Sequence, residues 1–133
     1  MLEYATDQNL QELVESKKLA MIDFFATWCG PCRMVGAEIE EIENNAIGLD
    51  IIKVDVDECP VASNQYSIEV VPTLLFVKNG KVVERVEGFL RAEQMLQIAG
   101  SLKWKDTGLI PTKNMLRLLW RGLKKKMGTV LAE

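Results

Sequence analysis

Residues 23–32, Asp-Phe-Phe-Ala-Thr-Trp-Cys-Gly-Pro-Cys, are the stretch on which the interpretation of the whole chain depends. The apolar run 19–26 that leads into it predicts a buried strand, which a single acid, Asp23, interrupts. Beyond Cys32, apolar residues recur at helical spacing among charged ones. We therefore expect the two cysteines at a strand-to-helix junction, with Cys29 near the N-cap of the helix and Cys32 in its first turns.

This position of the two cysteines favours thiol chemistry. The thiolate is the attacking species, and the unpaired N–H groups and partial positive charge of a helix N-terminus stabilise it. By position Cys29 is the more exposed sulfur and is expected to attack, while Cys32, one helical turn on, is expected to resolve the mixed disulfide. Pro31 suits a first helical position, and the Gly30-Pro31 pair is expected to hold the two sulfurs at a distance that permits a disulfide.

The residues around this pair resemble the thioredoxin family, whose active site reads Trp-Cys-Gly-Pro-Cys with an aspartate six residues before the first cysteine. Further segments follow in the order and spacing of that family: Lys53-Val54-Asp55-Val56-Asp57, Tyr66-Ser67-Ile68, Val71-Pro72-Thr73, Lys78-Asn79-Gly80 and Gly88. The resemblance covers residues 1–103. It implies an α/β thioredoxin fold, with a central mixed β-sheet flanked by helices, and a thiol-disulfide oxidoreductase that reduces protein disulfides through Cys29 and Cys32.

Pattern and turn residues predict the remaining elements. Strands are expected at 2–5, 49–56, 73–77 and 82–86, and helices after an N-cap at Asp7, at 29–44, at 60–65 and at 91–102. Asn79-Gly80 suits a type I′ turn between the last two strands. This alternation predicts a mixed sheet between helices. In the region of the 29–44 helix where the family commonly has a kinking proline, this chain has Gly36-Ala37.

Asp23 is expected to act on the second cysteine, and Lys53 is the candidate partner of Asp23. Burial of the strand on both faces would desolvate the Asp23 carboxylate and raise its pKa, which suits a general acid or base that works on Cys32 through water. The resemblance supports this role and puts a lysine at position 53, where it would pair with Asp23 if the two strands are neighbours. Two alternatives stay open, namely an aspartate that points to solvent and a plain surface lysine.

The surface that grips substrates is expected to be apolar. The resemblance implies a cis Val71-Pro72 bond that faces the cysteines, whereas the sequence alone favours trans, because only about 5–6% of such bonds are cis. Trp28 is expected to contact substrates, with packing against the domain as the alternative. Gly88 is expected to let the chain pass close to the active site. The predicted substrate-binding set is Trp28, Gly30, Pro31, Val71, Pro72 and Gly88.

Cys59 is expected to be inert. It follows the acidic run 55–58, which should raise the pKa of its thiol, so an unreactive third cysteine is favoured over a regulatory thiol or a dimer link. With three cysteines and no histidine, the chain falls short of a closed structural zinc site without an acid ligand. We expect neither a metal nor a cofactor.

The net charge of −3 conceals an uneven distribution. Residues 1–103 carry 9 basic and 17 acidic side chains, a sum of −8, and residues 104–133 carry 7 and 2, a sum of +5. We expect a thioredoxin domain at 1–103 and a basic C-terminal extension at 104–133, formed by a linker and an extra amphipathic helix over 112–127. This helix could pack on the acidic body, lie on an anionic membrane, bind a protein partner or be disordered.

Compartment and partners follow from the same features. The first residues lack the basic and apolar regions of a signal peptide, and no uncharged apolar stretch approaches about 18 residues. An odd number of cysteines argues against a secreted disulfide framework. We expect a cytoplasmic monomer that reduces protein disulfides, is recycled by a reductase of the thioredoxin-reductase type, and binds no nucleic acid. The alternative class is a non-catalytic adaptor that acts through its basic extension.

Overall fold

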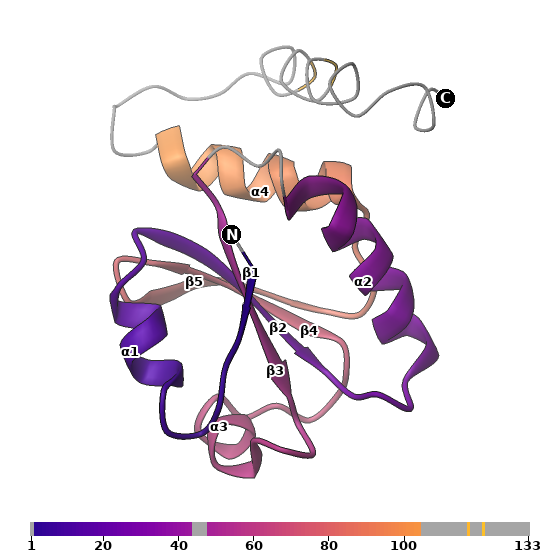
Figure 1. Cartoon of the computed structure of the whole chain (residues 1–133). Helices are drawn as coiled ribbons and strands as arrows, with labels where there is room; N and C mark the ends of the chain where they lie inside the picture. The colour runs from indigo at the N-terminus through magenta and orange to yellow at the C-terminus, as the bar shows by residue number, and fades with distance from the viewer. Residues whose placement is uncertain (1, 44–47, 105–116, 118–120, 122–133) are drawn as a thin grey trace.

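The structure, a computed structural model, describes residues 2–43 and 48–104 together with Arg117 and Arg121. In these ranges the chain forms the predicted alternation of strands and helices (Figure 1). The strands are β1 (Leu2–Tyr4), β2 (Leu19–Phe25), β3 (Asp50–Asp55), β4 (Thr73–Lys78) and β5 (Lys81–Glu87). The helices are α1 (Leu10–Glu15), α2 (Gly30–Glu43), α3 (Pro60–Gln65) and α4 (Ala92–Trp104).

The five strands form one mixed sheet in the order β1-β3-β2-β4-β5. Strands β1 and β2 run parallel to β3, whereas β4 runs antiparallel to both β2 and β5. Strand β2, which leads into the cysteine pair, therefore lies at the centre of the sheet. The predicted mixed sheet flanked by helices is confirmed.

Helices cover both faces of this sheet (Figure 1). Helices α2 and α4 pack on one face around a cluster that contains Met21, Phe76 and Met95. Helices α1 and α3 pack on the other face around a cluster that contains Ile22 and Phe24. Because alternate side chains of β2 point to opposite faces and both faces are covered, almost the whole strand is buried.

The predicted turn between β4 and β5 is confirmed. Asn79 has φ 50° and Gly80 has φ 82°, so both central residues adopt the left-handed backbone that a type I′ turn requires. Two residues separate the paired positions Lys78 and Lys81, as expected for a tight hairpin. Helix α2 is continuous through Gly36, and its predicted last residue, Asn44, lies outside the described residues.

The prediction that Asp7 caps the first helix is wrong. The turn before α1 is closed by Thr6 and Asn9, each of which donates its backbone N–H to the side-chain oxygen of the other, at 2.7 and 3.2 Å. Asp7 instead accepts hydrogen bonds from the N–H groups of Val61 and Ala62 in the first turn of α3, at 3.3 and 2.8 Å. A local pattern shows only nearby caps, and α3 comes next to Asp7 only through the tertiary fold.

The C-terminal extension stays largely untested. Helix α4 ends at Trp104, one residue past the predicted domain boundary, and the amphipathic helix predicted over 112–127 lies outside the described residues except at Arg117 and Arg121. The division into 1–103 and 104–133 therefore remains a prediction. Within the described ranges, no helix has the length and apolar character needed to cross a bilayer.

Candidate active site

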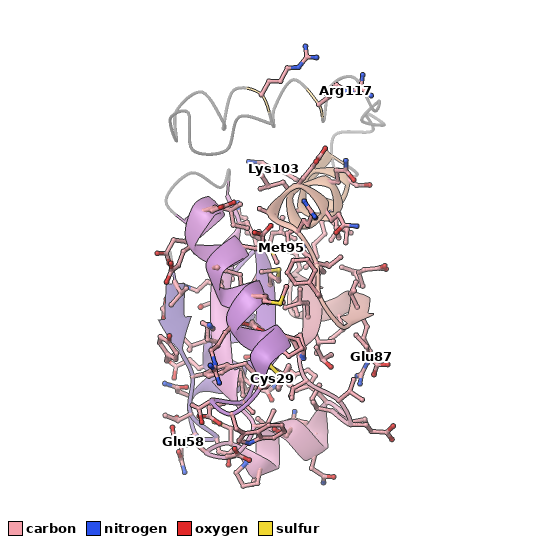
Figure 2. All side chains as sticks on the ribbon, turned by 90° about the vertical axis from the view of Figure 1, so that its right-hand side faces the viewer. Cys29, Glu58, Glu87, Met95, Lys103 and Arg117 are labelled. Carbon is pink, nitrogen blue, oxygen red and sulfur yellow. A yellow bond between two sulfur atoms is a disulfide. The ribbon has the colours of Figure 1, made fainter. Side chains whose placement is uncertain are left out.

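Cys29 and Cys32 are joined as a disulfide where the loop after β2 passes into helix α2, with their Cα atoms 5.2 Å apart. Figure 2 shows Cys29 at the end of this helix. The backbone N–H of Cys32 donates a hydrogen bond to the Sγ atom of Cys29 at 3.2 Å. An N–H group of the first helical turn is thus directed at the first sulfur, which is the arrangement that stabilises a thiolate.

Both cysteines lie just below the surface in this disulfide form. Cys29 is 6% exposed and Cys32 is 3% exposed, so Cys29 is the more accessible, as predicted, but by a small margin. Together with Ala26 they form a small apolar cluster, against which Phe25 and Val71 pack. Little of either cysteine is therefore accessible to solvent.

The loop before β4 faces the first sulfur. The Val71-Pro72 peptide bond is cis, as the family resemblance implied, and the Val71 carbonyl oxygen lies 3.7 Å from Cys29 Sγ. Gly88 donates its N–H to the Pro72 carbonyl oxygen at 2.9 Å and has φ 103°, a left-handed conformation that favours glycine. The end of β5 is thereby tied to the loop that faces the cysteines.

Exposed apolar side chains surround this end of the molecule. Trp28 is 67% exposed, while its indole N–H donates to Asp57 Oδ2 at 2.9 Å, so it is both accessible and fixed to the domain. Pro72 is buried and Val71 is half-buried, whereas their chain neighbours Val70 and Phe89 are 47% and 39% exposed. The sequence-based set omitted Val70 and Phe89. Their position next to Val71 and Gly88 was the signal that could have found them.

Asp23 lies fully buried at the centre of the sheet, beside Lys53 of the neighbouring strand β3. Its carboxylate oxygen Oδ2 is 3.5 Å from Lys53 Nζ, and neither carboxylate oxygen accepts a hydrogen bond from the described residues. Burial raises the pKa of Asp23 from 3.8 to about 6, against the opposing effect of the Lys53 charge. The strands are neighbours as required, and the alternative of a solvent-facing aspartate is excluded.

An open hollow of ≈ 390 Å³ lies between helix α2 and the end of strand β2. Cys32 and Gly36 line it from the helix and Lys53 from the sheet, so the second cysteine and the partner of Asp23 face the same space. A space of this size admits water. Water in the hollow can carry a proton between the interior of the site and solvent.

Cys59 is a buried free thiol. Its S–H donates to the carbonyl oxygen of Ala5 at 3.5 Å. The pKa of Cys59 is raised, as predicted, but burial is the largest cause, and the acids Asp7, Asp55 and Glu58 come second. Among the described residues, no group of three potential metal ligands comes together.

Fold and site together define a class of protein, the thiol-disulfide oxidoreductases with a thioredoxin fold. The family model described as Thioredoxin matches residues 1–100, so the chain belongs to the thioredoxin family. "Thioredoxin 2" of Chlorobaculum tepidum is 50% identical over 88 residues, which are 65% of this chain and 81% of that protein. "Thioredoxin" of Listeria monocytogenes is 40% identical over 99 residues, which are 74% of this chain and 95% of that protein.

Solved thioredoxin structures superpose on the fold. A mutant thioredoxin from Halobacterium salinarum has a TM-score of 0.71 at 28% identity, covering 75% of this chain and 88% of that one. Reduced thioredoxin from Schistosoma mansoni has a TM-score of 0.66 at 35% identity, covering 74% and 97%. With the paired cysteines, these relatives support protein-disulfide reductase activity of the thioredoxin type, and the adaptor alternative is not favoured. The family implies protein disulfide substrates and a reductase partner in general.

Proposed function

We propose that Cys29 is the nucleophile and Cys32 the resolving cysteine in the reduction of protein disulfides. The Cys29 thiolate attacks one sulfur of the substrate disulfide, whose S–S bond breaks while a Cys29–substrate disulfide forms, and the other substrate sulfur leaves as a thiolate that takes up a proton from solvent. Cys32 then loses its proton and attacks Cys29, which releases the second substrate thiol. Two electrons pass to the substrate, and the Cys29–Cys32 disulfide remains until a reductase returns two electrons to it.

The observation that carries this assignment is the hydrogen bond from the Cys32 N–H to Cys29 Sγ at 3.2 Å. A donor fixed by the helix backbone stabilises negative charge on Cys29 without a rearrangement of the protein. The smaller exposure of Cys32 supports its role as the second cysteine, because a resolving thiol needs to reach only Cys29.

Asp23 is proposed as the general base that removes the proton from Cys32, through water in the hollow beside α2. A carboxyl group with a pKa of about 6 is well matched to proton transfer near neutral pH. The Lys53 ammonium group, 3.5 Å from Asp23 Oδ2, stabilises the ionised form of Asp23 and so limits the rise in its pKa. When the cycle reverses, the same carboxyl group in its protonated form returns the proton to Cys32.

The surface around the cis peptide bond is proposed to bind an extended segment of the substrate. The Val71 carbonyl oxygen, close to Cys29 Sγ, is available to accept a hydrogen bond from a substrate backbone. Exposed apolar groups beside it supply contact area. The proposed set comprises Trp28, Gly30, Pro31, Val71, Pro72 and Gly88 from the sequence, with Val70 and Phe89 added from their exposure.

Insulin reduction in the presence of dithiothreitol tests the assignment. Cys29→Ser is expected to abolish the protein's acceleration of turbidity. Cys32→Ser, reduced beforehand and mixed with insulin after dithiothreitol has been removed, is expected to trap a mixed disulfide with the substrate that mass spectrometry detects. Cys59→Ala is the matched control and is expected to keep full turnover, because Cys59 is buried away from the pair. Full activity of Cys29→Ser would overturn the assignment.

We also propose that residues 1–103 are the catalytic unit and that the protein works in the cytoplasm. In the part of the chain that the structure describes, the two larger core clusters lie within residues 2–102, which supports the first proposal. A third cysteine without a disulfide partner supports the second, because oxidising compartments favour paired cysteines. The membrane surface or protein partner suggested for residues 112–127 rests on their basic, amphipathic sequence alone.

A further inference from the structure

We propose that Tyr4 is a positioning residue of the active site, which together with Phe25 holds the ammonium group of Lys53 against Asp23. The inference rests on the role proposed above for Asp23 and extends the site to the edge strand β1, which no sequence motif connects to the cysteines. It is carried by the strand register, by the distances around Lys53 and by the open space beside this lysine.

The strand register sets the three side chains in one row across the sheet. Tyr4 of β1 pairs with Lys53 of β3, and Lys53 pairs with Asp23 of β2. Side chains at paired positions of neighbouring strands project from the same face of a sheet. The row lies on the face that α2 covers, because Met21 and Ile51, two residues before Asp23 and Lys53, belong to the core cluster under this helix.

The ammonium group of Lys53 lies among a carboxylate and two aromatic rings. Its Nζ atom is 3.5 Å from Asp23 Oδ2, 4.7 Å from the ring centroid of Phe25 and 5.9 Å from that of Tyr4. Both rings lie within the range of a cation–π contact. The two rings also contact each other edge to face, with their centroids 6.2 Å apart and an angle of 77° between the planes.

The ammonium group of Lys53 can occupy another position, in the open hollow beside α2, unless the two rings keep it next to Asp23. A lysine side chain is a flexible four-carbon stem, and the hollow beside it is open. Gly36, on the helical wall of the hollow, has no side chain to confine the ammonium group, and even a Cβ added there would lie 3.7 Å from Nζ. Glu40 lines the same hollow, so a second carboxylate besides that of Asp23 borders the space beside the cation.

Other charged groups face the site as well. Asp23 pairs with Lys53 of β3 and with the apolar Leu74 of β4, Tyr4 of β1 lies beyond Lys53, and the titratable and charged groups that α2 places along the hollow beside Lys53 are Cys32, Arg33 and Glu40. Arg33 and Glu40 carry opposite charges on one wall of the hollow. The location of the Lys53 cation is therefore the variable that most directly changes the electrostatic potential at Asp23.

Tyr4 is the member of this group that can be changed without damage to the core. It is 65% exposed, and its ring lies outside the buried clusters, whereas Phe25 packs against the cysteines. Without the Tyr4 ring, Lys53 spends more time in the hollow and stabilises the Asp23 anion less. The midpoint of the Asp23 titration then moves to higher pH, by about half a unit for the loss of one exposed cation–π contact.

The experiment titrates the Asp23 carboxyl carbon by NMR in the oxidised full-length protein, with Asp23→Asn to assign the signal. Tyr4→Ala is expected to raise the midpoint by about half a pH unit. Tyr4→Phe, which keeps the ring, is expected to leave it unchanged. Lys53→Met is expected to raise the midpoint further, and Tyr4→Ala added to Lys53→Met is expected to have no additional effect, because the ring acts through the lysine.

Two results would overturn the inference: an unchanged midpoint in Tyr4→Ala, or a shift that persists in the Lys53→Met background. A structural role of Tyr4 alone would lower the melting temperature and leave the midpoint in place, so thermal unfolding of the same variants separates the two.

The pH dependence of Cys32 attack, followed by rapid quenching, distinguishes this inference from the role of Asp23. If the carboxyl midpoint moves in Tyr4→Ala but the rate profile does not follow, the positioning by Tyr4 stands and the base role of Asp23 fails. If the rate profile follows the Asp23 titration in the wild type but Tyr4→Ala alters neither, the base role stands and the positioning fails.

Discussion

The Asp23 side chain shows how a single buried carboxyl group links stability to the proposed chemistry. It has no exposed surface, and its folded-state pKa of about 6 lies above its ordinary value of 3.8. The folded protein therefore binds a proton that the unfolded chain has already lost between these two values. Stability is highest below about pH 4 with respect to this group, and it falls as the pH rises towards about 6.

Asp23→Asn removes this pH-dependent cost. The difference in free energy of unfolding between the variant and the wild type is expected to shift by about 2 kcal/mol in favour of the variant as the pH rises from about 4 to about 7. The reason is that burial destabilises only the ionised form of Asp23, which the variant cannot form. Urea denaturation of both oxidised proteins at the two pH values measures the gain. A stability difference that is the same at both pH values would contradict the raised pKa.

The residues closest to the chemistry could be predicted from sequence, because short-range patterns carry them. Cys29 and Cys32 are three positions apart, and Asp23 interrupts an apolar strand where an acid has no ordinary reason to be. Tyr4 could not be found this way. Its contact with Lys53 depends on which strand pairs with β3, and this pairing is fixed by tertiary packing between segments far apart in the chain.

At the scale of the elements, helix α2 supports the cysteines at one end and walls the hollow along its side. Gly36 lies in its interior without breaking it, although glycine is a poor helix former. The sequence could show that the usual proline is missing, but not whether glycine would bend the helix. In the structure the helix is unbroken through Gly36, and Val35 and Ile39 on either side are buried in the core cluster.

Gly36→Ala is expected to raise the free energy of unfolding by about 1 kcal/mol, from the gain in helix propensity. The new Cβ would meet Lys53 Nζ at 3.7 Å, an ordinary contact, so insulin reduction is expected to stay unchanged.

Gly88→Ala is the matched contrast. It adds the same methyl group in open space but at φ 103°, and is expected to lower stability by about 1 kcal/mol. Urea denaturation measures both, and loss of stability in Gly36→Ala would refute the interpretation.

The boundaries of elements were predicted less well than their order, and Asp7 illustrates the reason. A short polar residue before an apolar stretch is a sound sign of a helix N-cap, and the sequence contains this sign. The helix that Asp7 caps, however, is α3 rather than α1. Local chemistry was recognised correctly, whereas the partner was set by the packing of both helices on the same face of the sheet.

At the scale of the whole molecule, the charge is divided between an acidic body and a basic extension. Among the residues that the structure describes, the core clusters and the candidate site lie within residues 2–102. Deletion of residues 105–133 is expected to leave the rate of insulin reduction and the melting temperature unchanged at about 0.15 M salt.

The full-length chain at low and high salt is the control for this deletion. If the extension lies on the acidic body, its removal changes the melting temperature at low salt, and the effect disappears at high salt because the charges are screened. A fall in turnover at every salt concentration would show that the catalytic unit extends past residue 103.

The burial of Cys59 has a practical consequence for anyone who handles this protein. Of its three cysteine sulfurs, two form the internal disulfide and the third is buried, with a pKa that burial raises. The mass of the protein after treatment with a maleimide should therefore show how many cysteines are labelled. We expect no label on the native oxidised protein, two labels after gentle reduction, and three once the reduced chain is also denatured. The number of labels thus reports whether the Cys29–Cys32 disulfide is reduced, and labelling of Cys59 reports unfolding.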